Sequence, residues 1–157
     1  MQVILGLGTN QGDRFANLQT AIKKLTPHLA ALKCSGIYTS PALLLPDSPK
    51  AWDIEFLNMA VIGNTEAKPE ALLNICQHIE TEMGRETKHS KWSPRVIDID
   101  ILLYGDLALT EKTLTIPHAE LPNRAFALLP LLELKPDYPH TKNFAENHGT
   151  KRIGQFV

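Results

Sequence analysis

Two aspartates, Asp98 and Asp100, have the clearest chemical potential in the chain, because they stand two positions apart in an apolar run. Side chains at i and i+2 of a strand share a face, so the carboxylates would lie roughly 7 Å apart while Ile97, Ile99 and Ile101 point to the other face. Mg²⁺ takes oxygen ligands and keeps waters and substrate phosphates in its remaining positions. The pair therefore indicates one or two Mg²⁺ ions that hold a polyphosphate. A solvated acidic face is the plain alternative for two aspartates taken alone.

The segment before these aspartates carries the opposite charge. Residues 84 to 95 contain one acid, Glu86, and the basic residues Arg85, Lys88, Lys91 and Arg95. Guanidinium groups bind phosphate oxygens in pairs, and lysines act as point charges. Trp92 adds a large apolar side chain, which favours a surface that closes over a planar ligand. The loop and the aspartates together indicate a site for a metal-bound triphosphate.

Length and composition favour one domain, residues 1–157, in the cytoplasm. The chain has 157 residues, 43% of them hydrophobic, which is enough for one core. The formal net charge of −1 speaks against a protein that coats nucleic acid or a membrane surface. Cys34 and Cys76 lie far apart and indicate neither a disulfide framework nor a thiolate metal site. We expect no leader peptide and no membrane span, since no run reaches the roughly eighteen apolar residues that a span needs.

Apolar periodicity predicts the order strand, helix, strand, strand, helix, strand. The predicted strands are 3–7, 31–39, 56–63 and 96–104. One predicted helix follows Asp13 as its N-cap and ends before Pro27, and the other begins at Pro69 and ends at Gly84. This βαββαβ order is typical of an α+β, ferredoxin-like core, in which both helices pack on one face of an antiparallel sheet.

C-terminal additions are expected after this core. They are a short strand pair near 108 and 114–116, an apolar helix over about 122–133, and a polar tail from Lys135 without clear pattern. Inside the core, residues 40–53 are interrupted by prolines and predict a long binding loop rather than a regular element.

The turn after the first strand does not fit a dinucleotide-binding motif. Gly6 and Gly8 are followed by Gly12 rather than by a glycine three residues after Gly8, and no acid lies near residues 33–39 to bind a ribose. The chain also lacks the lysine-terminated glycine loop of Walker-type nucleotide-binding proteins. Side chains and metal ions would therefore hold any triphosphate.

Several strings occur in a fixed order along residues 3 to 136. They are residues 5–10 with 17–18, 38–41, 56–61, 79–80 with 84–85, 92–102, and 116–118 with 123–126. In these strings the chain resembles the 6-hydroxymethyl-7,8-dihydropterin pyrophosphokinases of folate biosynthesis. The resemblance implies transfer of the β,γ-diphosphate of ATP to the hydroxymethyl group of the reduced pterin, which gives the pterin diphosphate and AMP. ATP would be the co-substrate and two Mg²⁺ ions the cofactor.

The resemblance also implies roles for individual residues. Asp98 and Asp100 would bind the metal ions, and with Arg85 and Arg95 they would form the catalytic set. The nucleotide would be bound by Gln77, Lys88, Trp92, Arg95, Ile101, Thr115, His118 and Arg124. The pterin would be bound by Ser40, Pro41, Leu43, Phe56, Asn58 and Phe126. No general base is assigned, because the substrate supplies its own nucleophile and the protein mainly positions groups and neutralises charge.

Two other functions stay open from the residues alone. Another Mg-dependent nucleotidyl or glycosyl transferase could use the pair Asp98 and Asp100, and release of AMP from ATP would distinguish the two reactions. A ferredoxin-like nucleic-acid reader would present aromatic side chains for base stacking, whereas this strand presents two acids. We therefore expect small-molecule substrates, no nucleic-acid or membrane partner, and a monomer that could associate with neighbouring folate enzymes.

Overall fold

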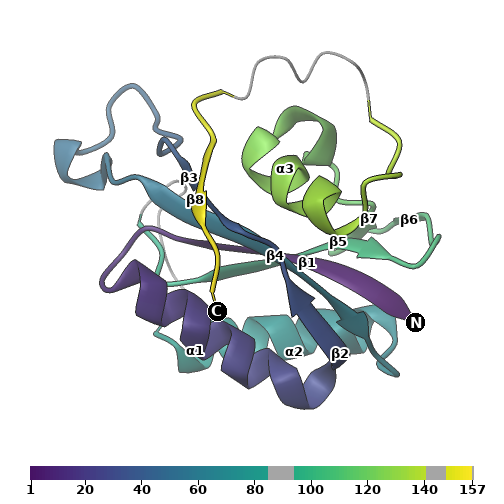
Figure 1. Cartoon of the computed structure of the whole chain (residues 1–157). Helices are drawn as coiled ribbons and strands as arrows, with labels where there is room; N and C mark the ends of the chain where they lie inside the picture. The colour runs from purple at the N-terminus through teal and green to yellow at the C-terminus, as the bar shows by residue number, and fades with distance from the viewer. Residues whose placement is uncertain (85–93, 141–147, 157) are drawn as a thin grey trace.

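The computed structural model has three layers: a sheet, two helices on one face of it, and a third helix on the other (Figure 1). The structure describes residues 1–84, 94–140 and 148–156. The main sheet has the antiparallel order β5-β1-β4-β3-β8, and β2 also pairs with β4. Its strands are β1 Gln2–Thr9, β2 Ala30–Cys34, β3 Ile37–Ser40, β4 Phe56–Asn64, β5 Asp98–Tyr104 and β8 Lys151–Gly154. A separate ribbon pairs β6 Leu109–Thr110 with β7 Thr115–Ile116.

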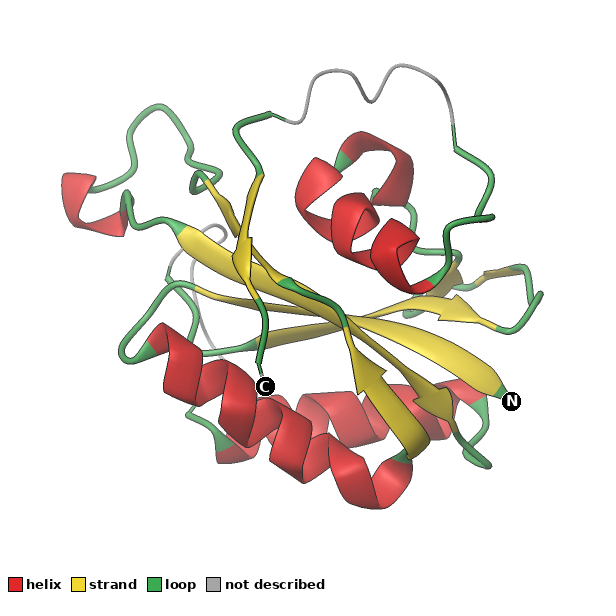
Figure 2. Ribbon diagram, viewed as in Figure 1, coloured by secondary structure: helices red, strands yellow, loops and turns green. Residues whose placement is uncertain are grey.

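Helices α1 and α2 cover one face of the sheet, below it in Figure 2. Helix α1, Arg14–Leu25, begins where the Asp13 carboxylate accepts a hydrogen bond from the backbone N–H of Ala16 at 3.1 Å. Helix α2, Pro69–Glu82, has proline in its first turn and ends before Gly84, whose φ of +103° suits a residue without a Cβ. Both helices therefore begin and end close to the positions that the sequence predicts.

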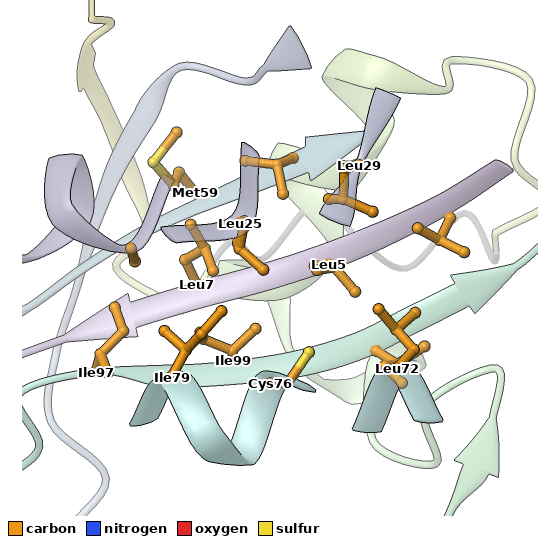
Figure 3. Packing of buried hydrophobic residues seen from close by; sticks show 14 of the residues in the cluster. Leu5, Leu7, Leu25, Leu29, Met59, Leu72, Cys76, Ile79, Ile97 and Ile99 are labelled. Atoms are coloured by element: carbon orange, nitrogen blue, oxygen red, sulfur yellow. The ribbon is translucent and has the colours of Figure 1, made fainter. Parts of the chain in front are cut away.

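The main core lies between these two helices and the sheet (Figure 3). Strand β1 contributes Val3, Leu5 and Leu7, and the alternate residues Gly6 and Gly8 face the opposite side. A smaller core on that opposite side packs α3, Ala125–Leu134, against Ile4, Ala60 and Leu102. The predicted α+β, ferredoxin-like fold with C-terminal additions is confirmed, because the sheet is antiparallel, α1 and α2 share one of its faces, and α3 and β8 follow as additions.

The predicted single strand 31–39 is wrong, since it is two strands, β2 and β3, separated by Ser35 and Gly36. At this break the Ser35 N–H still donates to the carbonyl of Ala60 at 2.8 Å, while the Ser35 hydroxyl accepts a hydrogen bond from the N–H of Ala60 at 2.8 Å and donates to the carbonyl of Gly36 at 2.7 Å. Strand β5 likewise begins at Asp98 instead of residue 96, and the loop 40–53 contains a short 3₁₀ turn, Lys50–Trp52.

The tail that lacked a pattern contains strand β8, which pairs with β3. A carboxylate on α3 holds it there: Glu133 accepts hydrogen bonds from Arg152 Nη2 at 3.0 Å, the Tyr38 hydroxyl at 2.7 Å and the Gly36 N–H at 3.0 Å. Burial and the Glu133 carboxylate raise the pKa of Tyr38 to about 12. Among the described residues, no helix is long and apolar enough to cross a membrane.

Candidate functional site

A cavity of about 340 Å³ opens on the face of the sheet that carries α3, across the strands β4, β1 and β5. Gly6 and Gly8 of β1 lie along its floor. Gly8 pairs with Asn58 on one side and with Asp98 on the other, and Gly6 pairs with Asp100. Because neighbouring strands are about 4.8 Å apart, residues on β4 and β5 face each other over a bare strip of backbone about 10 Å wide. A flat ligand could lie across this strip.

One end of the cavity holds the acids and Arg95. The Arg95 Nη1 lies 3.2 Å from Asp98 Oδ1, with the side chain of Arg95 15% exposed and that of Asp98 30% exposed. Within the described part of the chain, the buried Nε of Arg95 has no hydrogen-bond partner. A guanidinium with an unused buried N–H beside a cavity is suited to bind phosphate oxygens.

The opposite end of the cavity is aromatic and polar. Asn58 is 4% exposed, and its Nδ2 donates to the Ser40 hydroxyl at 2.8 Å. This bond leaves the Asn58 Oδ1 as an acceptor beside Gly8. A Cβ atom added to Gly8 would lie 3.4 Å from this oxygen. Phe56 lies next to it, and Phe126 of α3 lies across the cavity with the Arg124 guanidinium 5.7 Å from the centre of its ring. Two rings and a fixed amide can bind a planar heterocycle that carries hydrogen-bond donors.

His118 lines the cavity near the acidic end. Its backbone N–H donates to the carbonyl of Leu102 at 3.1 Å, which anchors the residue to β5. Its Nδ1 accepts a hydrogen bond from the N–H of Glu120 at 3.2 Å, so the Nε2 nitrogen carries the proton in the neutral ring. A neutral His118 can thus donate one hydrogen bond from Nε2.

Most of the residues predicted from the sequence come together in this cavity. Those that line it are Ser40, Pro41, Leu43, Phe56, Asn58, Arg95, Asp98, Asp100, His118, Arg124 and Phe126. Three others do not line it: Gln77 is exposed on α2, Thr115 is half-buried on β7, and the side chain of Ile101 is buried in the core on the other face of the sheet. Arg85, Lys88 and Trp92 lie outside the described residues.

Comparison with known protein families identifies the family of the chain. The model of the 7,8-dihydro-6-hydroxymethylpterin-pyrophosphokinase family matches residues 4–136. The chain belongs to this family, HPPK. Residues 4–136 therefore make up an ATP-dependent pyrophosphokinase that acts on hydroxymethyldihydropterin in folate biosynthesis.

Individual relatives agree with the family. The chain is 42% identical over 142 residues to the 2-amino-4-hydroxy-6-hydroxymethyldihydropteridine pyrophosphokinase of Aquifex aeolicus, and this match covers 88% of this chain and 82% of that protein. It is 40% identical over 156 residues to the folate synthesis bifunctional protein of Chlamydia caviae, covering 99% of this chain but 35% of the relative. A crystal structure of Plasmodium falciparum HPPK-DHPS shares the fold, with a TM-score of 0.68 at 18% identity over 97% of this chain and 47% of that one.

Three residues of this site have no role assigned from the sequence. Gly6 and Gly8 enter the sequence analysis only in the turn that fails the dinucleotide motif and in the string 5–10 of the family resemblance, whereas their lack of side chains forms the cavity floor. Glu80 of α2 is 5% exposed, and its Oε2 accepts a hydrogen bond from the N–H of Ile99, between the two aspartates, at 3.0 Å. Glu80 stands four residues after Cys76 on the apolar stripe of α2, and this position was the signal of its burial.

The acids also affect the core beneath them. Burial, followed by the charges of Glu80 and Asp100, raises the pKa of Cys76 to about 12. Glu80 binds the backbone between Asp98 and Asp100, and Arg95 pairs with Asp98, so this end of the cavity brings several carboxylates together beside one guanidinium.

Proposed function

We propose that the cavity binds 6-hydroxymethyl-7,8-dihydropterin between Phe56 and Phe126 and directs its hydroxymethyl oxygen toward the β-phosphorus of ATP held near Asp98 and Asp100. The observation that supports this most is the floor of β1, because Gly8 pairs with both Asn58 and Asp98. Attack of the hydroxymethyl oxygen breaks the bond between the α- and β-phosphates, releases AMP and leaves the diphosphate on the pterin. The hydroxyl proton leaves with solvent, since no general base is assigned.

The donor groups at the acidic end fit Mg²⁺. Two carboxylates line one cavity, and Mg²⁺ commonly binds one or two carboxylates and completes its shell with waters and substrate phosphates. Among the described residues no group of three or more His, Cys, Asp and Glu could hold a metal by itself. This supports ions that bind together with the nucleotide, and we propose two of them. Bound Mg²⁺ would neutralise the triphosphate and polarise the phosphorus under attack.

The protein's own residues supply position and charge. In the proposal the Arg95 guanidinium binds phosphate oxygens through its unused Nε–H and exchanges its bond to Asp98 for bonds to the ligand. His118 donates from Nε2 to another phosphate oxygen, and Arg124 adds a further cation at the rim. Holding both reactants in one orientation is the main source of rate for a reaction that needs no covalent catalyst.

At the aromatic end, Asn58 Oδ1 accepts a hydrogen bond from the edge of the pterin, because Ser40 already occupies Nδ2. Pro41 and Leu43, which follow β3, contribute to the wall around the pterin. The predicted nucleotide contacts of Gln77, Ile101 and Thr115 remain part of the proposal. A contact with Ile101 would use its backbone, since its side chain lies in the core on the other face of the sheet.

Several wider predictions complete the proposal. We infer a monomeric, cytoplasmic enzyme with one domain, which could associate with neighbouring folate enzymes. The bifunctional relatives support the last point, since the chain spans about a third of the length of the Chlamydia caviae protein. In the described residues both Cys34 and Cys76 are free.

One assay tests the donor, the acceptor and the bond that breaks. The purified chain is incubated with ATP and Mg²⁺, with and without 6-hydroxymethyl-7,8-dihydropterin, and AMP and ADP are quantified. We expect AMP only when the pterin is present, and no ADP. ADP, or AMP that forms equally without the pterin, would contradict the proposal and favour another transferase.

A further inference from the structure

One buried amide joins the two ends of the cavity. Asn10, in the turn after β1, is 1% exposed. Its Oδ1 accepts a hydrogen bond from the N–H of Arg95 at 2.7 Å, and its own N–H donates to the carbonyl of Arg95 at 3.0 Å. Its Nδ2 donates to the carbonyl of Ile54 at 3.1 Å. Asn10 therefore binds two segments that lie 41 residues apart in the chain (95 − 54).

Both segments lead directly into the cavity. Ile54 precedes Phe56 by two residues, and the intervening Glu55 is held by the first residue of α1, because Arg14 Nη1 donates to its carbonyl at 2.8 Å. Arg95 provides the guanidinium that meets Asp98. Neither Ile54 nor Arg95 belongs to a helix or strand. Single backbone bonds hold them locally: the Ile54 N–H donates to the carbonyl of Trp52 at 2.8 Å, and the Arg95 carbonyl accepts from the N–H of Asn10. The side-chain amide of Asn10 adds the link between the two segments.

We propose that Asn10 is a positioning residue that sets the distance between the pterin-binding and phosphate-binding ends of the site. This inference rests on the proposed function. The reaction needs the hydroxymethyl oxygen and the phosphorus within reach of each other, and a displacement of about 1 Å can lower turnover about 100-fold. Asn10 touches neither reactant, and acts through the backbone of Ile54 and of Arg95.

The two halves of the amide can be separated by substitution. Asn10→Asp keeps an oxygen that accepts from the Arg95 N–H but puts a second oxygen against the carbonyl of Ile54. Asn10→Ala removes both bonds. We expect Asn10→Asp to weaken pterin binding about tenfold with little change in ATP binding, and Asn10→Ala to lower kcat about 100-fold as well.

Asn17→Ala is the matched control. Asn17 lies close to Asn10 and also makes two side-chain hydrogen bonds, to Thr9 Oγ1 at 3.1 Å and to the carbonyl of Gln11 at 2.7 Å. It has no such bond to Ile54 or Arg95 among the described residues. We expect its kcat and both affinities to stay within about twofold of the unsubstituted chain, although its thermal stability falls as that of Asn10→Ala does.

The experiment combines calorimetric binding of pterin and of a non-hydrolysable ATP analogue, steady-state kinetics well below the unfolding temperature, and NMR-detected exchange of the Arg95 amide. That amide should exchange faster in Asn10→Ala but not in Asn10→Asp. A purely structural role would lower thermal stability in all three variants and leave kcat and the affinities unchanged, which would overturn the proposal. Equal losses in Asn17→Ala, or an Arg95 amide unaffected by Asn10→Ala, would overturn it too. If the unsubstituted chain forms no AMP, the proposed function fails, while the exchange measurement still decides whether Asn10 holds Arg95.

Discussion

The glycine floor of the site makes Gly8→Ala the most informative substitution. A Cβ at this position would lie 3.4 Å from Asn58 Oδ1 and 3.7 Å from Cδ1 of Phe56, which are ordinary contact distances. Gly8 is not among the residues with positive φ, so alanine can adopt its backbone conformation. Alanine in place of glycine within a strand adds about 0.5 to 1 kcal/mol of stability. We therefore expect the variant to fold at least as well as the unsubstituted chain.

Binding should suffer where folding does not. The new methyl group would fill the space between the Asn58 amide and the edge of the Phe56 ring, where the pterin is proposed to lie. An extra methyl in a closely packed site costs about 1 to 3 kcal/mol. At 1.4 kcal/mol for each factor of ten, the pterin should bind about 5-fold to 150-fold more weakly. The atoms nearest to the new methyl group belong to Asn58 and Phe56 rather than to the acids of β5, so the affinity for ATP should change less than that for the pterin.

Calorimetric titration with the pterin, in the presence of a non-hydrolysable ATP analogue, measures this loss, and a thermal melt checks the fold. Gly6→Ala is the companion variant, since its Cβ would meet Cδ1 of Leu102 at 3.2 Å, a flexible side chain near the acids. It should affect pterin binding less than Gly8→Ala. A stable Gly8→Ala protein that binds the pterin as tightly as the unsubstituted chain would show that the pterin does not lie over β1.

Three further predictions concern charge. Asp100→Asn should lower AMP formation at least about 100-fold, while thermal stability stays unchanged or rises because one of several clustered acids is removed. Kinetics over a range of Mg²⁺ concentrations and a thermal melt test this. Normal turnover would contradict the metal assignment. Arg95→Lys keeps the charge but loses the buried Nε–H, so the KM for ATP should rise and kcat should fall about tenfold or more. Unchanged steady-state kinetics would contradict the role given to the guanidinium. Glu133→Gln should destabilise the fold by about 1 to 2 kcal/mol at pH 7 in urea unfolding, since it weakens the bonds from Gly36 and Tyr38. Burial opposes ionisation of Glu133, but the bonds from Arg152, Tyr38 and Gly36 outweigh it and lower its pKa. The stability difference between the two proteins is therefore present above about pH 4.3 and disappears as the pH falls through the lowered pKa of the folded state. A difference that stays constant down to pH 3 would contradict this.

The core fold could be predicted because its signals are local. Asp98 and Asp100 alternate with isoleucines, and this alternation alone places both acids on one face of β5 and the isoleucines in the core. Helix α1 has a capping aspartate and a buried stripe, so its boundaries follow from nearby residues. Strand β8 has no apolar alternation, and long-range contacts place it: Arg152 bonds to Glu133 on α3. A four-residue polar strand of this kind cannot be recognised from its own residues.

The buried polar residues were harder to predict for a related reason. Asn10 has no signal of burial in the sequence, and Glu80 has only its place on the apolar stripe of α2, yet both are at least 95% buried. The hydrogen bonds described above join them to backbone groups of Arg95, Ile54 and Ile99, and a bond to backbone leaves no signal in residue types. Family resemblance was needed to assign Asn58, whose amide is otherwise an unremarkable polar residue within an apolar strand. Side-chain chemistry could be inferred from residue types, whereas the constraints on loop backbone depended on the folded structure.

These constraints explain how a small sheet can hold two substrates so close together. The residues proposed to bind the pterin lie on β3, β4 and α3 and in the segment after β3, and the acids lie on β5, with only β1 between β4 and β5. A side chain on the cavity face of β1 would keep the ligands apart, and glycine at positions 6 and 8 avoids this. The same strand then ends in the turn that carries Asn10, which binds the segments next to Phe56 and Asp98. Strand β1 thus provides both the open floor and the fixed spacing that transfer between two bound substrates requires.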